Sequence, residues 1–561
     1  MKNIPRCILC FCLLLLPLKF TGYVGNGELP NFPLTGWEWA IFTCYPGFLS
    51  AVIGGVALLV TVAIHRNIPW KPLSLVFFLP LLAGMIGLIQ TTETDFSHLW
   101  LWHFSGAAAF ALAICWCIRN DPDAARWFAA SLAISGLISV LHGWHQHFWG
   151  FQQLREYWLD MQAKGVQISK TMFEKMDQNR VYGAFVDPNV YSAHLLLCLP
   201  FSIYFAFTAG RRFEYPRLGS WILTSTVTIL YAGALYWSGS RGAMLGLAAG
   251  AACLGWSLPV VRNWRWRWAL PAAAVVLGLA MVLLYTARSN RGGMASASAR
   301  MDYYTTAFKM FRQAPATGVG LGEFFPWYLR MKAEDAEVTR NPHSIFFAFL
   351  SECGLIGGLA ALFLIALPWI AAMRRPATLG TLACGALGGY MFHSLFQFNE
   401  LIPGTLYLAF AIISLLFLED ETHRPDAPAP IRIPARAVAL LFALLCFIPL
   451  KRIPGELAYQ RGEAADKRHP GFGYDNYLAA ERLLPNAPGP KRILMFSDIA
   501  RYDYKKALEN AKKLQKVAPH RSATYSNIAR IHTELGNVRE AAEARRISRL
   551  WYPTQKEETR K

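Results

Sequence analysis

The chain has 561 residues, of which 54% are hydrophobic and 14% aromatic, and its formal net charge is +19. This composition is too apolar and too aromatic for a soluble enzyme. It indicates instead many apolar runs of about 20 residues, the length at which a helix spans a membrane. The charge does not indicate nucleic acid, because the basic residues are scattered between apolar runs and form no single stripe. The 11 cysteines lie in apolar stretches, so neither zinc nor a disulfide framework is predicted.

The apolar runs predict an all-α, polytopic membrane protein with about 12–13 transmembrane helices. Residues 1–22 carry two basic residues before an apolar stretch, a pattern shared by a signal peptide and a short first helix; no small-x-small cleavage site follows, which favours the helix. Residues 1–38 are assigned to this segment and residues 39–450 to the membrane domain. The further candidate spans are 40–64, 73–90, 99–118, 127–148, 190–208, 220–237, 243–261, 268–285, 345–370, 378–398, 402–418 and 436–450.

Basic residues in the short connections predict the orientation of the chain. On one side the connections hold many, and on the other side they hold a single one, Arg241. The basic side is expected to face the cytoplasm, so the long loops 149–189 and 286–343, and everything after residue 451, face outward. The basic residues on the expected cytoplasmic side are Arg66, Lys71, Arg119, Arg126, Arg211, Arg212, Arg217, Arg262, Arg265, Arg267, Arg374, Arg375, Arg424, Arg432 and Arg436.

The outward loop 286–343 combines positive charge with a helical segment. From Arg288 to His343 it holds eight Lys or Arg against five acids. Pro315 and the glycines that follow it predict turns. A cationic, partly helical cap that closes with a histidine indicates a site for an anionic, lipid-borne substrate. Within its helical segment, four apolar or aromatic residues are expected to share one face: Met301, Tyr304, Phe308 and Phe311.

Three residues at the expected outer face are candidates for catalysis. Arg241 breaks the charge rule of the outward connections, and an arginine fork suits phosphate oxygens; the alternative is an arginine that reaches to lipid headgroups. Arg300 lies on the loop helix, with a solvated charge as its alternative. Asn341 as N-cap and Pro342 as first residue would put His343 in the first helical turn, where the helix dipole disfavours imidazolium. A neutral imidazole can accept a proton from a hydroxyl nucleophile; the alternative is an interfacial histidine.

Three further residues are candidates for substrate binding. Glu352 is an acid within an apolar helix, and such residues are usually paired or functional. Arg180 adds positive charge at the end of the other long loop. The segment Asp187-Pro-Asn189 is expected to cap the helix that follows, and capping is the favoured role of Asn189. Three histidines between residues 142 and 147 lie among aromatic residues without nearby acids, which favours an aromatic belt over a metal site.

The segment 456–561 has the composition of a soluble helical domain. Pro485, Pro519 and Pro553 are spaced 34 residues apart, and Ala507 and Ala541 share that period. Small residues where paired helices cross, with a proline closing each unit, are typical of tetratricopeptide repeats. The segment is therefore interpreted as roughly two and a half such repeats, which are expected to bind an envelope partner.

Together these motifs resemble the O-antigen ligase and polymerase family, whose relatives include bacterial O-oligosaccharyltransferases. The resemblance covers about residues 40–420. One departure is Pro342, because the family often has the histidine directly followed by asparagine. The matching pieces are Arg180…Gly183-Ala-Phe…Pro188-Asn189, Ser240-Arg241-Gly242, Arg300…Pro315…Gly318-Val-Gly-Leu-Gly…Phe324, and Asn341-Pro342-His343-Ser344…Glu352-Cys-Gly354…Gly357.

The resemblance implies an inverting membrane glycosyltransferase with a GT-C-like helical fold and no metal, nucleotide sugar or other cofactor. Its donor would be a glycan on undecaprenyl pyrophosphate at the outer face of the bacterial inner membrane. Arg241 and Arg300 would hold the pyrophosphate, and His343 would deprotonate the acceptor hydroxyl. The acceptor distinguishes three possible enzymes. It would be lipid A core for a ligase, another lipid-linked glycan for a polymerase, and a protein hydroxyl for an oligosaccharyltransferase; the ligase is preferred.

Two other classes remain as alternatives. A transporter of lipid-linked sugar favours charged residues within several spans and a detectable internal repeat, whereas the notable charges here cluster on one face. A scaffold anchored in the membrane lipids needs one or two spans rather than a dozen. Both alternatives are therefore less favoured than an enzyme.

Overall fold

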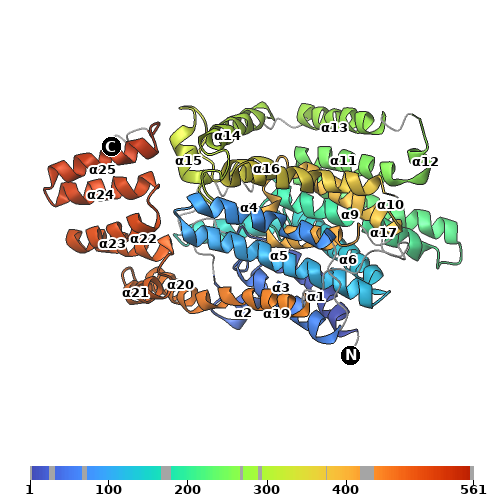
Figure 1. Ribbon diagram of the computed structural model, residues 1–561, viewed down its shortest axis with the longest axis horizontal. Coiled ribbons are helices and arrows are strands. Elements are labelled where there is room, and N and C mark those ends of the chain that lie inside the picture. The colour runs from blue at the N-terminus through green and yellow to red at the C-terminus, as the bar shows by residue number, and fades with distance from the viewer. Residues whose placement is uncertain are drawn as a thin grey trace.

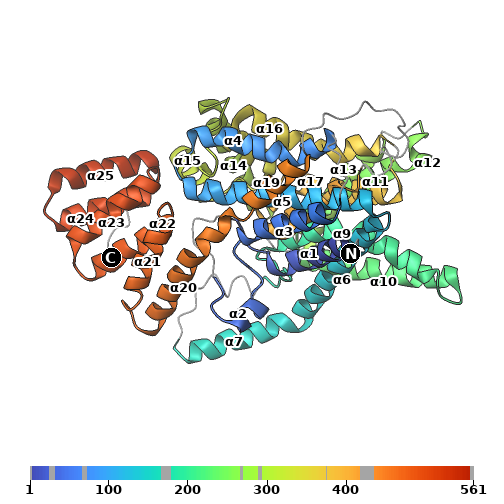
Figure 2. The same cartoon turned by 60° about the horizontal axis from the view of Figure 1, so that its bottom comes forward.

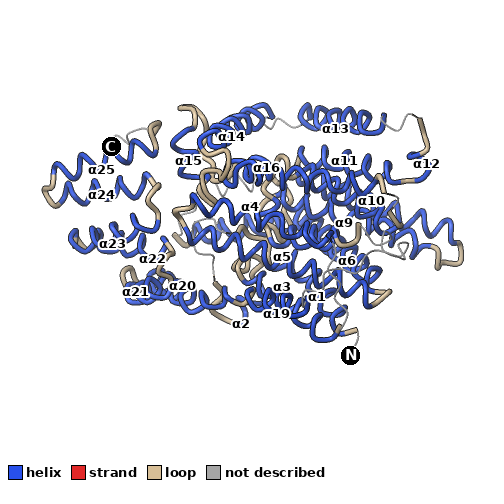
Figure 3. The backbone as a smooth tube through the Cα atoms, viewed as in Figure 1, coloured by secondary structure: helices blue, strands red, loops and turns tan. Residues whose placement is uncertain are grey.

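The computed structural model describes residues 3–24, 32–65, 72–165, 178–265, 269–288, 293–374, 376–416 and 435–555. Within these ranges the chain is built from helices and holds no strand, and one isolated antiparallel bridge joins Phe20 and Cys44. Figure 3 shows this helical path along the whole described backbone. The predicted all-α fold class is confirmed.

Six stretches of the described chain are long and apolar enough to cross a membrane. They confirm the prediction of a polytopic membrane protein, and each contains or overlaps a predicted span. Two of them are compound, because α6 continues through the π-helical turn η3 (Gln146–Gly150) into α7 (Phe151–Ala163), and α19 continues through η5 (Ile448–Arg452) into α20. The six stretches are α5 (Thr94–Asn120), α6 (Ala124–His145) with α7, α9 (Pro188–Gly210), α10 (Pro216–Ser238), α16 (Ile345–Ala372), and α19 (Ala435–Leu445) with α20 (Ile453–Arg468).

Shorter helices fill the remaining predicted spans. The run 73–90 is broken into the 3-10 helix η1 (Pro72–Phe78), α4 (Leu79–Gly87) and the 3-10 helix η2 (Leu88–Gln90). The first segment forms the helix that the sequence favours, with Leu9, Leu13 and Leu16 fully buried in the main core. The 20-residue helix α13 (Ala269–Arg288) covers the predicted span 268–285. The other short helices are α1 (Ile4–Lys19), α2 (Gly36–Ile41), α3 (Leu49–Ile64), α11 (Arg241–Ser257), α12 (Pro259–Arg262), α17 (Thr378–His393) and α18 (Pro403–Ile413).

Helices α11 and α17 cross at very short range because glycines face each other. A Cβ atom on Gly250 would lie 2.6 Å from the carbonyl oxygen of Gly385, and one on Gly246 would lie 2.8 Å from that of Gly389. Small residues let two helix backbones approach in a membrane protein. The two pairs run in antiparallel register, so the start of α11 lies beside the end of α17, which brings two polar helix ends together.

The turn after Pro315 is docked on a break in α16. Gly354 interrupts the helix with φ 68° and ψ −157°, and the amide of Leu355 donates to the carbonyl of Pro315 at 2.8 Å. A Cβ atom on Gly318, at φ 71°, would lie 2.3 Å from the backbone of Glu352. The predicted turns are confirmed, and the positive φ values and close backbone approach explain why glycines stand there.

The loop helix α14 (Gly293–Gln313) buries a different face from the predicted one. Tyr303, Ala307 and Met310 are buried against α15 (Phe324–Met331) and α16, whereas Met301 is 62% and Phe308 49% exposed. The apolar residues of this helix supply two possible faces at helical spacing. Packing against α15 and α16 buries the face of Tyr303, Ala307 and Met310, and helical periodicity alone does not show which of the two faces is buried.

The C-terminal part continues from α20 as five more helices, each packed on its sequence neighbour. Ala507 and Ala541 are buried between them, and Pro485, Pro519 and Pro553 each stand two residues after a helix end. The helical pairing agrees with the predicted period, while the tetratricopeptide interpretation stays a prediction. These helices are α21 (Tyr474–Leu483), α22 (Pro488–Ala500), α23 (Tyr504–Val517), α24 (Ser522–Glu534) and α25 (Val538–Trp551).

The tail formed by α21–α25 lies at the end of the molecule that carries α15, while α12 lies toward the opposite end (Figures 1 and 2). Which compartment each end faces stays a prediction. Six of the basic residues used for it lie outside the described residues: Arg66, Lys71, Arg267, Arg375, Arg424 and Arg432.

Candidate active site

His343 stands in a tight turn just before α16. Its amide donates to the side-chain oxygen of Asn341 at 3.1 Å, and its φ is 52°. The N-cap of α16 is Ser344, whose hydroxyl accepts from the amide of Phe347. The prediction that Asn341 caps the helix and that His343 lies in its first turn is therefore wrong. The Asn341 side chain closes an Asx turn instead, and a left-handed residue cannot begin a helix.

The imidazole of His343 is held by a chain of side-chain hydrogen bonds. Its Nδ1 lies 3.1 Å from Oε1 of Gln397, and Nε2 of Gln397 donates to Oδ1 of Asp187 at 3.1 Å. Because a carboxylate only accepts, Asp187 fixes the orientation of the Gln397 amide. The amide oxygen then requires a proton on Nδ1. Nε2 is left as the lone-pair nitrogen, and no described residue forms a hydrogen bond with it.

The surroundings of His343 favour the neutral ring. Burial lowers the pKa of His343, and the positive charge of Arg300 lowers it further, against smaller opposing effects of Gln397 and Asp187. The ring stacks on Tyr303 at 5.7 Å between centroids and meets the edge of Phe398 at 4.7 Å. A neutral imidazole at pH 7 follows, as the sequence predicts, although the cause is burial and a neighbouring arginine rather than a helix dipole.

Arg180 forms hydrogen bonds that connect three segments at this end of the membrane domain. Its Nε donates to the carbonyl of Ser238 at 2.8 Å, and its Nη2 donates to Oδ1 of Asn189 at 3.1 Å. The cap of α9 is Asp187, which accepts from the amides of Asn189 and Val190. Within the predicted capping segment Asp187-Pro-Asn189, the aspartate is the cap, and the prediction that Asn189 itself has this role is wrong because Asp187 accepts those amides.

Arg241 and Arg300 stand on two different helices, α11 and α14. Arg241 is the first residue of α11, directly after Ser240, whose hydroxyl lies 3.4 Å from Nε2 of His393. Arg300 lies on α14, close enough to act electrostatically on both His343 and His393. His343 and Arg300 are thus brought together, and Arg241 follows in the chain directly after Ser240, which contacts His393.

Glu352 has its partner in the backbone of the loop that precedes α16. Its Oε1 accepts from the amide of Phe324 at 3.2 Å, at the start of α15. The carboxylate thereby braces the glycine turn against α16. The sequence singles out this acid correctly but does not reveal its partner.

Several polar residues of this site escape the sequence reasoning, because they stand in a short connection at the end of an apolar span. Gln397 orients His343, and the Nδ2 amide of Asn399 lies 3.0 Å from Nδ1 of His393 and 2.9 Å from the hydroxyl of Ser394. Polar residues this dense beside apolar helices are costly unless they are paired or functional. That density is the signal that identifies them.

The histidines between residues 142 and 147 pack among aromatic rings. His147 stacks on Trp237 with 4.0 Å between centroids and 10° between planes, and Trp144 meets Trp237 edge-on. Among the described residues, no group of three histidine, cysteine or acidic side chains is arranged to hold a metal ion.

The fold and the site define a multi-pass helical membrane protein with a cationic, histidine-containing site at one end. A family model described as O-Antigen ligase matches residues 226–362, the stretch that contains Arg241, Arg300, His343 and Glu352. Residues 226–362 are thus similar to an O-antigen ligase domain, and this match supports the O-antigen ligase family and a membrane enzyme of ligase or polymerase type. Such an activity uses a lipid-linked glycan donor and a glycan acceptor. No curated protein matches the chain.

Proposed function

We propose that the protein is an O-antigen ligase that moves a glycan from undecaprenyl pyrophosphate to an acceptor hydroxyl at the periplasmic face of the inner membrane. The observation that carries this proposal is the hydrogen-bonded chain Asp187–Gln397–His343 beside Arg300. It leaves a neutral imidazole with one available lone pair next to a fixed positive charge. This combination supports a base and an anion site in one place.

His343 acts as the general base for the acceptor. Nε2 takes the proton of the acceptor hydroxyl while the oxygen attacks the anomeric carbon of the glycan. The ring becomes an imidazolium, and the Asp187 carboxylate stabilises that charge through the amide of Gln397. Because the attacking oxygen enters opposite the leaving group, the anomeric configuration inverts.

The arginines stabilise the leaving group. The bond between the anomeric carbon and the phosphate oxygen breaks with its electron pair, so the diphosphate gains negative charge as the reaction proceeds. Arg241 and Arg300 are positioned to hold that charge, and a lost donor of this kind costs about 10²–10³ in rate. The reaction is expected to need no metal ion, because guanidinium groups can neutralise the diphosphate.

The predicted orientation places this site in the periplasm. The cationic connections of the opposite end face the cytoplasm by the charge rule, and the donor glycan is then presented on the same side as the tail. Topology mapping of a reporter fused after residue 555 tests this orientation, since a cytoplasmic reporter contradicts it.

The proposal is tested by reconstituting the full-length protein in liposomes with a lipid-pyrophosphate glycan and three acceptors: lipid A core, the lipid-linked glycan itself, and a hydroxyl-bearing protein. The ligase proposal predicts transfer to lipid A core, with His343→Ala at least ~10² slower while its membrane insertion is unchanged. Transfer mainly to a second lipid-linked glycan identifies a polymerase, and transfer to protein identifies an oligosaccharyltransferase. Full activity of His343→Ala contradicts the proposed base.

A further inference from the structure

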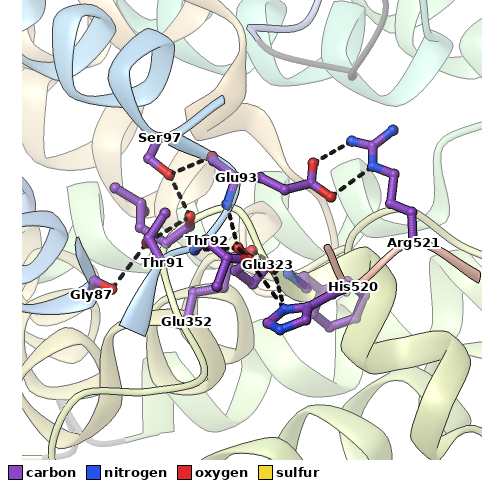
Figure 4. A network of polar contacts seen from close by, with 11 residues as sticks. Gly87, Thr91, Thr92, Glu93, Ser97, Glu323, Glu352, His520 and Arg521 are labelled. Carbon is purple, nitrogen blue, oxygen red and sulfur yellow. Dashed lines mark hydrogen bonds and ion pairs between the residues drawn. The ribbon is translucent and has the colours of Figure 1, made fainter. Parts of the chain in front are cut away.

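The tail is fastened to the membrane domain by paired acids and bases (Figure 4). Arg521, the residue before α24, makes a two-pronged contact with Glu93: Nε to Oε1 at 2.7 Å and Nη2 to Oε2 at 2.5 Å. Its neighbour His520 lies 3.2 Å from Oε2 of Glu323. Bidentate arginine–carboxylate pairs fix geometry as well as charge. The tail therefore meets the membrane domain in one defined position.

The acids of this junction are anchored in the membrane domain. Glu323 is fully buried, and its Oε1 accepts from the amides of Thr92 and Glu93 at 2.7 Å and from the hydroxyl of Thr92 at 2.6 Å. On the tail side, His520 stacks on Trp551 with 4.2 Å between centroids. Trp551 also meets Trp327 of α15 edge-on at 5.6 Å. The same contact region thus connects α5, α15 and the tail.

Arg521 is also one wall of a cavity of about 80 Å³. The other walls include Asn341, which holds the His343 turn, and the acids Glu352 and Glu400, with Trp100 among several aromatic rings. Neither Arg241 nor Arg300, the arginines assigned above to the diphosphate, is part of its lining. The cavity is therefore a compartment next to the histidine but separate from the diphosphate-binding arginines.

The chemistry of the cavity fits a hydroxyl-bearing group. Oε2 of Glu400 is buried without a hydrogen-bond partner among the described residues, and such an oxygen is costly unless something binds it. Glu400 stands in the 3-10 turn η4 (Asn399–Leu401) between α17 and α18. Burial raises the pKa of Glu400 to about 8, so at pH 7 the group mostly carries a proton. A carboxylic acid both donates and accepts, as a sugar hydroxyl does.

We propose that this cavity binds a hydroxyl-bearing part of a glycan through Glu400 and Arg521, so that the tail is part of the substrate site. The choice of a glycan as ligand rests on the function proposed above. A cavity of about 150 Å³ holds one benzene molecule, so this smaller one takes the hydroxyl-bearing edge of a sugar rather than a whole ring. The sugar belongs either to the donor glycan or to the acceptor, and both present the same chemistry.

Two pairs of variants separate binding from folding and docking. Glu400→Leu removes hydrogen bonding from the cavity, while Glu400→Gln keeps one donor and one acceptor. Arg521→Gln removes the wall of the cavity, while Glu93→Gln removes only its docking partner, which is not part of the lining. Arg546→Gln breaks an exposed two-pronged pair with Glu543 elsewhere in the tail and serves as the matched control.

The full-length protein in liposomes is assayed for transfer, with the KM for the lipid-linked glycan and for the acceptor measured separately. Glu400→Leu and Arg521→Gln are expected to raise one of the two KM values at least tenfold, because a site built to bind a hydroxyl discriminates strongly through it. The KM that rises identifies the source of the sugar. Arg546→Gln is expected to stay within threefold of the wild type. Glu400→Gln is expected to have a smaller effect than Glu400→Leu, and Glu93→Gln a smaller effect than Arg521→Gln.

The proposal is overturned if Glu400→Leu or Arg521→Gln leaves both KM values within threefold, or if Glu93→Gln raises them as much as Arg521→Gln. A direct binding experiment keeps this outcome apart from failure of the proposed function. Free oligosaccharide, released from the donor lipid by mild acid, is titrated against His343→Ala protein with and without Glu400→Leu. Absence of transfer by the wild-type protein contradicts the function, whereas equal binding by these two proteins contradicts the cavity.

Discussion

Two polar clusters lie at the same end of the molecule and contain similar residues, but their charges are paired differently. At the tail junction each base meets an acid: Arg521 with Glu93, and His520 with Glu323. At the candidate active site the histidine is held by a neutral amide, and its acid, Asp187, acts one residue further away. Arg241 has no hydrogen bond or ion pair with the described residues. Paired charges therefore join the tail to the membrane domain, whereas we propose that the positive charge of the candidate active site binds a ligand.

The largest effect on the rate of transfer is expected when the positive charge of Arg241 is removed. Arg241→Ala should lower kcat by about 10²–10³, because one donor to the developing negative charge is lost. Arg241→Lys should recover only part of the rate, since an ammonium lacks the planar fork that binds two phosphate oxygens. Transfer in liposomes measures both variants, with Arg211→Ala, at the opposite end of the membrane domain, as the control. Equal rates for all three would remove Arg241 from the reaction.

At the junction, the ion pair between Glu93 and Arg521 should contribute to the stability of the protein. Glu93→Gln leaves Arg521 without its charge partner in a mostly buried position, and breaking a buried pair costs about 3–5 kcal/mol. Thermal unfolding in detergent should show this loss, and a double-mutant cycle with Arg521→Gln should show strong coupling. The exposed pair of Glu543 and Arg546 should show no measurable change. Coupling as weak as in that pair would mean that the junction does not hold the tail.

The two clusters can also be made alike by giving His343 an acid as its direct partner. Gln397→Glu puts a carboxylate beside Nδ1, which should raise the pKa of His343. In the wild-type protein the pKa of His343 is lowered from its ordinary value of 6.5, so the imidazole stays neutral to a lower pH than a free imidazole side chain does. The acid limb of the kcat/KM profile should therefore move to higher pH in the variant, so that activity is lost earlier on acidification. An unmoved limb would exclude His343 as the group that titrates.

The smallest expected effect is the loss of stability at the tail junction when the pH is lowered. Burial opposes ionisation of Glu323, but hydrogen bonds from His520, Thr92 and Glu93 outweigh it and lower the pKa of Glu323. A carboxyl with a depressed folded-state pKa contributes stability above its ordinary pKa of 4.5 and loses it as the pH falls through the folded value. Unfolding temperatures between pH 7 and pH 3 should fall more steeply for the wild type than for Glu323→Gln. Parallel curves would contradict this contribution.

Sequence reasoning predicts the parts of the molecule that are encoded locally. The apolar runs give the helices, and the glycines after Pro315 give the turns that dock on Gly354. The identity of His343 follows from a motif, but its geometry does not, because the Asn341 side chain competes with the helix start for the amide of His343. The choice between two faces of α14 likewise depends on what packs against it.

The remaining features depend on residues that are far apart in the chain. Gln397 stands 54 positions after His343, and Arg521 stands 428 positions after Glu93. No spacing or periodicity joins such pairs, since each residue alone resembles an ordinary polar side chain of a loop. The cavity beside His343 arises from the same long-range contacts, and it therefore becomes visible only in the folded chain.

Chemical rescue tests the central claim most directly. His343→Ala protein in liposomes is given the lipid-linked glycan and acceptor, and product is measured as imidazole is added. If His343 is the base that activates the acceptor hydroxyl, imidazole should restore product in a concentration-dependent manner, more strongly as the pH rises through the pKa of free imidazole. A His343→Ala protein that transfers glycan at the wild-type rate before imidazole is added would contradict the account.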